Sequence, residues 1–342
     1  MRLEIAPRQL RLRTPLAAAH GTVAERELLD VLILGADGVA GAGEAAPLPS
    51  YDGVTLDDVR GALEDCRPIV HDAEGLPRAQ VLQACRDAAV LPQAVAAIDL
   101  ALWDLEGRRA DVPVWRLLGA HPLPEPVAVN ALIAAEDRAG AAAEAARAVA
   151  AGFSCVKLKA GIGDDAGRAA AVRAAVGPDV AIRLDANGAW SVGGAIAHLR
   201  ALAPSRIELC EEPVHGVEEL RDVAEAVDVP IAMDESGVGP GALGSGATPI
   251  VCLKLSRCGG ITGLLEAAET VRAAGGEVYL ASTLDGPLGI AGALHAAAVL
   301  RPSRPCGLAT LGAFEGLDVD GALSIEGGLM RVPEGPGLGV RA

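Results

Sequence analysis

The stretch between residues 155 and 255 contains five short apolar runs that carry a charge at or near their end: CVKLK (155–159), IRLD (182–185), IELCE (207–211), IAMD (231–234) and VCLKL (251–255). The charges recur at intervals of about two dozen residues, which is the length of one β-strand plus one helix. A (β/α) barrel builds its active site from side chains at the carboxyl ends of its strands. The sequence therefore predicts that these charges converge on one site.

The same alternation extends on both sides of this stretch. Eight strands are predicted, at residues 127–132, 155–159, 181–185, 206–211, 230–234, 250–255, 277–282 and 306–310. Ala-rich amphipathic segments such as 139–151 and 263–274 fill the first seven gaps as helices. The predicted fold class is α/β, a (βα)7β TIM-like barrel.

The first 125 residues do not follow this period. Alternating strands are predicted at 3–12 and 28–34, with a turn at 36–38, and helical spacing follows at 56–70, 79–89 and 92–118, the last as one helix or two. The Gly-rich residues 317–340 read as strands and turns that return to this part. We predict an α+β capping domain (1–125), a barrel (126–312) and a C-terminal segment (313–342) that completes the capping domain.

Composition excludes several classes of function. The 342 residues carry a formal charge of −16, which argues against general binding to nucleic acid or to a membrane surface, since both need basic patches. No apolar stretch reaches the roughly 18 residues of a membrane span, and residues 1–5 lack the apolar core of a signal peptide. Cys155, Cys210 and Cys252 lie in predicted strands, where we expect small apolar core residues and reduced thiols. These features predict a cytoplasmic protein.

Three carboxylates end three consecutive predicted strands: Asp185, Glu211 and Asp234. Each alone could be a salt-bridge partner at the barrel rim, but three hard oxygen donors together predict a Mg²⁺ site, with Mn²⁺ as a substitute. No His or Cys is expected at a ligand position, which disfavours zinc.

The lysines indicate what such a metal would assist. Lys157 and Lys159 are two apart on one strand and point to the same face, and Lys254 approaches from the opposite wall. The charge of Lys157 beside Lys159 favours the neutral amine that a general base needs. A lysine base next to a dication suits the removal of a proton adjacent to a carboxylate.

On these residues the chain resembles the muconate-lactonising subgroup of the enolase superfamily over nearly its whole length. The resemblance is carried by KLK (157–159), LDAN (184–187), EEP (211–213), MDES (233–236), KLSRCGG (254–260) and, upstream, GEAAPLP (43–49) and AIDLALWDL (97–105). It implies a metal-dependent enzyme that acts on a small carboxylate. Racemases, epimerases, cycloisomerases and dehydratases share this machinery, so the resemblance does not choose among them.

Two segments favour o-succinylbenzoate synthase as the first reading. STLDGPLG (282–289) and CGLAT (306–310) are similar to segments of those synthases, although Asp285 stands where they often carry Glu. Dipeptide epimerases typically have an Asp-x-Asp pair at the eighth strand, which is missing here, but residues 254–260 are at least as close to the epimerases. The alternatives are an N-succinylamino acid racemase, a dipeptide epimerase and a muconate-type cycloisomerase.

In the first reading, a carbon–oxygen lyase performs a syn dehydration that feeds menaquinone biosynthesis. The resemblance implies that Lys159 is the base, that Lys254 stabilises the charge that develops, and that Glu235 orients Lys254. Asn187 would support the metal site. Expected substrate contacts are His20, Arg26, Tyr51, Asn187, Ser282 and Asp285. A homo-oligomer is compatible with the family, and a catalytically silent binding protein is the alternative from another class.

Overall fold

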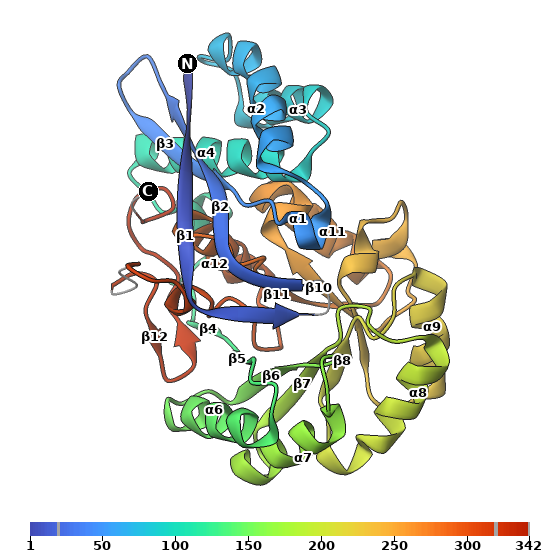
Figure 1. Cartoon of the computed structure of the whole chain (residues 1–342). Helices are drawn as coiled ribbons and strands as arrows, with labels where there is room; N and C mark the ends of the chain where they lie inside the picture. Colours follow the sequence, from blue (N-terminus) through green and yellow to red (C-terminus); the bar gives the residue numbers. More distant parts are fainter. Residues whose placement is uncertain (19–20, 318–320, 341–342) are drawn as a thin grey trace.

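The computed structural model describes residues 1–18, 21–317 and 321–340, and it has two parts (Figure 1). The N-terminal part begins with an antiparallel sheet in the order β1-β2-β3: Arg2–Ala18, Gly21–Leu34 and Ala40–Ala45. After the short helix α1 (Pro49–Asp52) come α2 (Leu56–His71), α3 (Arg78–Ala88), α4 (Pro92–Ala110) and α5 (Val114–Leu117). The predicted order of strands followed by helices is confirmed.

The segment predicted at 92–118 forms two helices rather than one. Helix α4 ends where Asp111 adopts a left-handed conformation with φ of 53°, and Pro113 precedes α5. The backbone of α4 lies directly against β3, because a Cβ on Gly41 or Gly43 would stand 2.1 Å from a carbonyl oxygen of the helix. Only glycine permits this close packing of strand and helix.

The second part is a curled parallel sheet of seven strands in chain order (Figure 1). The strands are β5 (Ala131–Ile133), β6 (Cys155–Lys159), β7 (Ala181–Asp185), β8 (Leu209–Glu211), β9 (Ile231–Met233), β10 (Ile250–Lys254) and β11 (Glu277–Ala281). The main helices between and after them are α6 (Arg138–Ala150), α7 (Asp165–Val176), α8 (Val192–Ala201), α9 (Val217–Ala226), α11 (Gly260–Ala273) and α12 (Pro287–Leu300). The predicted α/β barrel fold is confirmed.

The ends of the barrel differ in detail from the prediction. The first predicted strand, 127–132, is divided into β4 (Val127–Ala128) and β5. Residues 306–310 do not form a regular strand, and the prediction of one is wrong. Instead Cys306 pairs with Val129 and Gly307 pairs with Ala281 in isolated parallel bridges. Two bridge residues are enough to join β11 to the segment between β4 and β5, so the ring closes without a full eighth strand.

The C-terminal segment packs against both parts. Strands β12 (Ile325–Glu326) and β13 (Leu329–Met330) pair with β4 at the barrel. Further on, Gly337 exchanges backbone hydrogen bonds with Val112 and Val114, and Leu338 donates to the carboxylate of Asp104 on α4. The predicted return of the chain to the capping domain is confirmed for the described residues.

Buried polar side chains hold the capping domain over the barrel. The carboxylate of Glu44, at the end of β3, accepts hydrogen bonds from the backbone amides of Gly286 and Leu288 at the start of α12, at 2.6 and 3.1 Å. Asp99 on α4 accepts from the amide and hydroxyl of Thr262 on α11, at 2.9 and 2.6 Å. The capping domain is thereby fixed to the strand ends that carry the predicted site. Among the described residues, no helix combines the length and the apolar character needed to cross a membrane.

Candidate active site

The three predicted metal ligands come from neighbouring strands. The ends of β7 and β8 are in register, so that Asp185 lies beside Glu211. Strand β9 follows, and Asp234 is the residue directly after its end. All three side chains are at most 4% exposed. The parallel register therefore gathers the carboxylates at one edge of the sheet, as predicted.

Two lysines of β6 hold these carboxylates from one side. The Nζ atom of Lys157 lies 2.7 Å from Glu211 and 2.9 Å from Asp185. The Nζ atom of Lys159 lies 2.8 Å from Asp185 and donates to Oδ1 of Asn187 at 2.9 Å. Burial acts to lower the pKa of Lys157, but Asp185 and Glu211 outweigh burial and keep that pKa above its usual value. Lys157 is therefore a fixed cation beside Lys159.

The third lysine enters from the far side of the sheet. Lys254 ends β10, which is separated from β6 by the three strands β7, β8 and β9, and its Nζ atom lies 2.5 Å from Asp234. It also donates to the hydroxyl of Tyr51, at 2.5 Å, and Arg257 donates to the same hydroxyl at 2.7 Å. Tyr51 belongs to α1 of the capping domain, so the site is made by both parts of the chain.

The distribution of lysine in the sequence agrees with a chemical role. The chain has three lysines, and all of them line this pocket, while its other basic side chains, apart from histidine, are arginines. Arginine stays protonated at accessible pH, whereas an amine can lose and regain a proton. The lysines of this chain are thus confined to one pocket.

The structure gives Glu235 a hydrogen bond to Asn187. Its Oε1 atom accepts a hydrogen bond from Nδ2 of Asn187, at 2.9 Å, and Asn187 in turn binds Lys159. Lys254 interacts with Glu235 only through charge. The role of Glu235 in orienting Lys254 stays a prediction, and the hydrogen bond of Glu235 goes to Asn187 beside Lys159.

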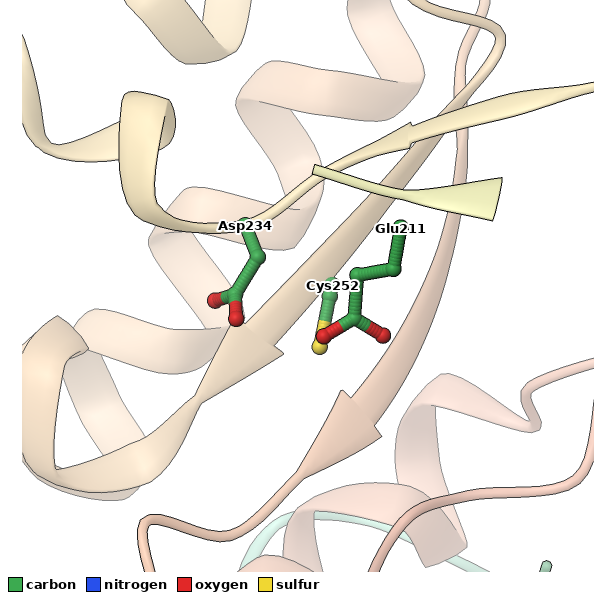
Figure 2. Close-up of side chains that lie close together, drawn as sticks. All are labelled: Glu211, Asp234 and Cys252. Carbon is green, nitrogen blue, oxygen red and sulfur yellow. The ribbon is translucent and has the colours of Figure 1, made fainter. Parts of the chain in front are cut away.

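Cys252 also lies in the site. One ligand atom each from Glu211, Asp234 and Cys252 lie within 4.8 Å of one another (Figure 2). Asp185 is not part of this compact group. Cys252 is buried in the core as expected, but its sulfur also lies next to two predicted ligands, which the sequence reading did not foresee. Its place two residues before Lys254 on one strand was the available signal, because such residues share a face.

Two further residues were missed from the sequence. The hydroxyl of Tyr279, on β11, donates to Oε2 of Glu211 in a very short hydrogen bond. The chain has two tyrosines, and each donates to a predicted metal ligand, because Tyr51 donates to Asp234 at 2.9 Å. Glu212 accepts hydrogen bonds from the amide of Asp234 and from the amide and hydroxyl of Ser236, and it thereby fixes the turn that carries Asp234.

The pocket above these groups has a mainly apolar wall. Its lining includes the side chains of Leu16, Val23, Leu48, Leu132, Leu284 and Ala309, and the neutral polar residues Asn130, Ser282, Thr283 and Thr310. Among the described lining residues, Asp185 is the sole carboxylate. Ser282 and Thr310 are joined to each other through their hydroxyls, at 3.0 Å.

The expected substrate contacts divide into three groups. Tyr51, Asn187 and Ser282 line the pocket. Arg26 and Asp285 are not among its lining residues, so the structure does not bring these two side chains to the pocket. The guanidinium of Arg26 is buried and donates to the backbone carbonyls of residues 46, 47 and 284, while Asp285 is buried and accepts from Thr283. His20 lies outside the described residues.

Comparison with known proteins is consistent with this geometry. The domain described as mandelate racemase / muconate lactonizing enzyme, N-terminal, matches residues 1–119, and the one described as enolase C-terminal domain-like matches residues 140–342. The hydrophobic dipeptide epimerase of Enterococcus faecalis is 31% identical over 97% of this chain and 96% of its own. The N-succinyl-L-Arg/Lys racemase of Bacillus cereus is 25% identical over 97% of this chain and 92% of its own.

A solved structure of a dipeptide epimerase is also similar to this chain over nearly its whole length. The dipeptide epimerase of Enterococcus faecalis, complexed with Mg and the dipeptide L-Leu-L-Tyr, has a TM-score of 0.88 at 29% identity and covers 99% of this chain and 98% of its own. Both matched domains and a relative above 30% identity over almost the whole chain point to the same family. The chain therefore belongs to the mandelate racemase and muconate lactonizing enzyme family of the enolase superfamily.

Proposed function

We propose that this protein inverts the configuration at the α-carbon of an amide-linked amino acid by proton transfer between Lys159 and Lys254. The observation that carries this proposal is that two lysines on opposite walls line one pocket, with the carboxylates between them. A carbon acid held between two amines can lose its proton to one and regain a proton from the other, which reverses its configuration.

Asp185, Glu211 and Asp234 would hold Mg²⁺, with Mn²⁺ as a substitute. Their hard, buried oxygen donors fit such an ion. The related dipeptide epimerases of Enterococcus faecalis and Cytophaga hutchinsonii are described as complexed with Mg and a dipeptide. Mg²⁺ would supply the electrostatic stabilisation of negative charge that develops on the substrate carboxylate as the α-proton leaves.

The residues of the chain then have separate tasks. Lys159, aligned by Asp185 and Asn187, handles the proton on one face of the substrate. Lys254, aligned by Asp234 and Tyr51, handles it on the other. Lys157 adds fixed positive charge at the carboxylates, and the capping domain covers the pocket and excludes water from the reaction.

The relatives support this reading over the synthase reading. Those at 25–31% identity over nearly the whole chain include a dipeptide epimerase and an N-succinylamino acid racemase, both isomerases. Neither a lyase activity nor a place in menaquinone biosynthesis has comparable support. The first reading from sequence is therefore replaced by its alternative.

The pocket wall indicates which amino acid derivatives fit. A free dipeptide would bring its ammonium group into the pocket, where the described wall offers apolar side chains and hydroxyls but no carboxylate apart from Asp185. Burial of an unpaired charge typically costs several kcal/mol. We propose that the substrate nitrogen carries an acyl group and that both substituents are predominantly apolar.

The test is α-proton exchange in D₂O, followed by NMR with each enantiomer of an N-acylated apolar amino acid. The wild type should exchange and interconvert both enantiomers. Lys159→Ala and Lys254→Ala should each retain exchange with one enantiomer only, and the two variants should prefer opposite ones. Lys159→Arg keeps the positive charge but has no removable proton, so it should behave as Lys159→Ala does.

Two results would contradict the proposal. Loss of exchange with both enantiomers in Lys159→Ala, together with turnover of a cyclohexadiene hydroxy acid by the wild type, would restore the one-base synthase reading. A kcat/KM for Ala-Glu that equals or exceeds the value for N-acylated amino acids would contradict the proposed substrate without an ammonium group, while leaving the two-lysine mechanism intact.

A further inference from the structure

We propose that Glu211, Asp234 and Cys252 form a second metal-binding mode, selective for thiophilic divalent ions such as Zn²⁺ and Cd²⁺. This mode shares two carboxylates with the proposed Mg²⁺ site and replaces Asp185 by a sulfur ligand. It needs no assumption about the substrate.

Geometry is the first reason. A sulfur atom and one oxygen from each carboxylate all lie within 4.8 Å of one another, so a single ion can contact all three (Figure 2). The three residues come from the end of β8, the residue after β9 and the middle of β10. They are at most 4% exposed and held by the sheet. The barrel thus presents these ligands without a rearrangement of the backbone.

The state of the Cys252 thiol is the second reason. This side chain is 4% exposed and points toward the two carboxylates (Figure 2), yet its thiol has no hydrogen-bond partner among the described residues. By contrast, the buried thiols of Cys66, Cys155, Cys210 and Cys306 each contact an oxygen acceptor. A buried thiol that lies beside two carboxylates, and that no other group uses, is available as a ligand.

Ligand chemistry separates the two modes. Carboxylates suit Mg²⁺, whereas thiolate selects softer ions, and Zn²⁺ takes mixed sulfur and oxygen ligands in a tetrahedral site. Asp185 is bound by Lys157 and Lys159, at 2.9 and 2.8 Å, and it does not belong to the compact group that includes the sulfur. On binding, the S–H bond of Cys252 breaks, the proton passes to solvent and the sulfur–metal bond forms. The fourth position is left for water or another oxygen donor.

Competition with Mg²⁺ follows from the shared carboxylates. One ion at Glu211 and Asp234 excludes a second ion from the same oxygens. A thiophilic ion should therefore displace Mg²⁺ at low concentration and inhibit any activity that depends on Mg²⁺.

The experiment is a Cd²⁺ titration of the metal-free protein, with the ultraviolet charge-transfer absorption of the cadmium–thiolate bond as the signal. The wild type should give a band that saturates at one ion per chain and that excess Mg²⁺ suppresses. Cys252→Ser should lose this band and bind Cd²⁺ at least about tenfold more weakly, a factor at the low end of the losses seen when a contact that supports a metal site is removed. Its affinity for Mg²⁺, measured by calorimetry, should fall by less than its affinity for Cd²⁺, because Mg²⁺ prefers oxygen donors to sulfur.

Cys258→Ser is the matched control, because Cys258 is a more exposed thiol that lies outside the cluster. It should keep the band and the Cd²⁺ affinity. Equal band intensity in Cys252→Ser and wild type would overturn the proposal. If Cys252→Ser fails to fold, the wild type still decides, because a cadmium–thiolate band that excess Mg²⁺ does not suppress would assign the bound cysteine to another place.

Discussion

Removal of one buried hydroxyl, in Tyr279→Phe, should weaken metal binding without removing any predicted ligand. Tyr279 is 1% exposed, and its hydroxyl donates to Oε2 of Glu211. Burial, with the neighbouring Cys252 and Glu211, raises the pKa of Tyr279 well above its usual value, so the hydroxyl keeps its proton and acts as a donor. Its task is to hold the Glu211 carboxylate in one orientation.

The size of the effect follows from what remains. A hydrogen bond to a charged group contributes about 1.5–3 kcal/mol. Lys157 still holds both oxygens of Glu211, at 2.7 and 2.8 Å, so the loss should fall near the lower end of that range. Loss of a group that orients a metal ligand typically costs roughly 10–100-fold in metal affinity. We expect about a tenfold weaker affinity for Mg²⁺, with a modest loss of stability.

The assay is calorimetric titration of Mg²⁺ into the metal-free protein, together with urea denaturation. Thr248→Val is the control, because the Thr248 hydroxyl is also buried and donates to the carbonyl of Ile250 at 2.8 Å, away from the carboxylates. The control should lose stability but not Mg²⁺ affinity. Equal Mg²⁺ affinity of Tyr279→Phe and wild type would refute the reasoning that Tyr279 positions a metal ligand.

Two other predictions concern metal dependence and pH. Asp234→Asn should weaken Mg²⁺ binding and reduce turnover by orders of magnitude, because a neutral amide is a poorer ligand for a hard ion, and full activity after exhaustive chelation would remove the metal assignment. Burial lowers the pKa of His295 from 6.5 to about 4. As the pH falls, the imidazole therefore takes up a proton in the unfolded chain at a higher pH than in the folded chain. The free energy of unfolding should decrease between about pH 6.5 and pH 4, by up to roughly 3 kcal/mol. Urea denaturation across this pH range measures the loss of stability. His295→Gln, whose amide can still accept from Trp115 and donate to Leu338, should make this pH dependence smaller. An unchanged pH dependence in that variant would show that other groups cause the loss of stability.

The sequence alone determined the barrel and the main chemical groups of the site. Asp185, Glu211 and Asp234 follow strands of a regular period, and strand ends in a parallel barrel meet at one edge whatever the details of packing. Lys157 and Lys159 share a face because strand side chains alternate. These inferences needed only local periodicity and the known geometry of strands, and the gathering of these groups is confirmed.

The tertiary structure alone decided which other polar residues join the site. Tyr51 reaches Asp234 from another domain, and Tyr279 reaches Glu211 across the barrel, so neither contact has a local pattern. Arg26 and Asp285 were expected to contact substrate, but Arg26 lies in β2 and both side chains turn inward to backbone and hydroxyl partners. The direction of a polar side chain depends on which partner satisfies it, and such a partner can be far away in the sequence, as Asp234 is 183 residues from Tyr51.

The surroundings of Cys252 were determined partly by the sequence and partly by the tertiary structure. Its position two residues before Lys254 places it on the inward face, which the alternation of a strand does determine. A thiol on an inward face is usually part of an apolar core, because cysteine is among the most buried residue types. Only the packing of β8, β9 and β10 brings two carboxylates next to this thiol, and the distance between groups on separate strands is a property of the folded chain.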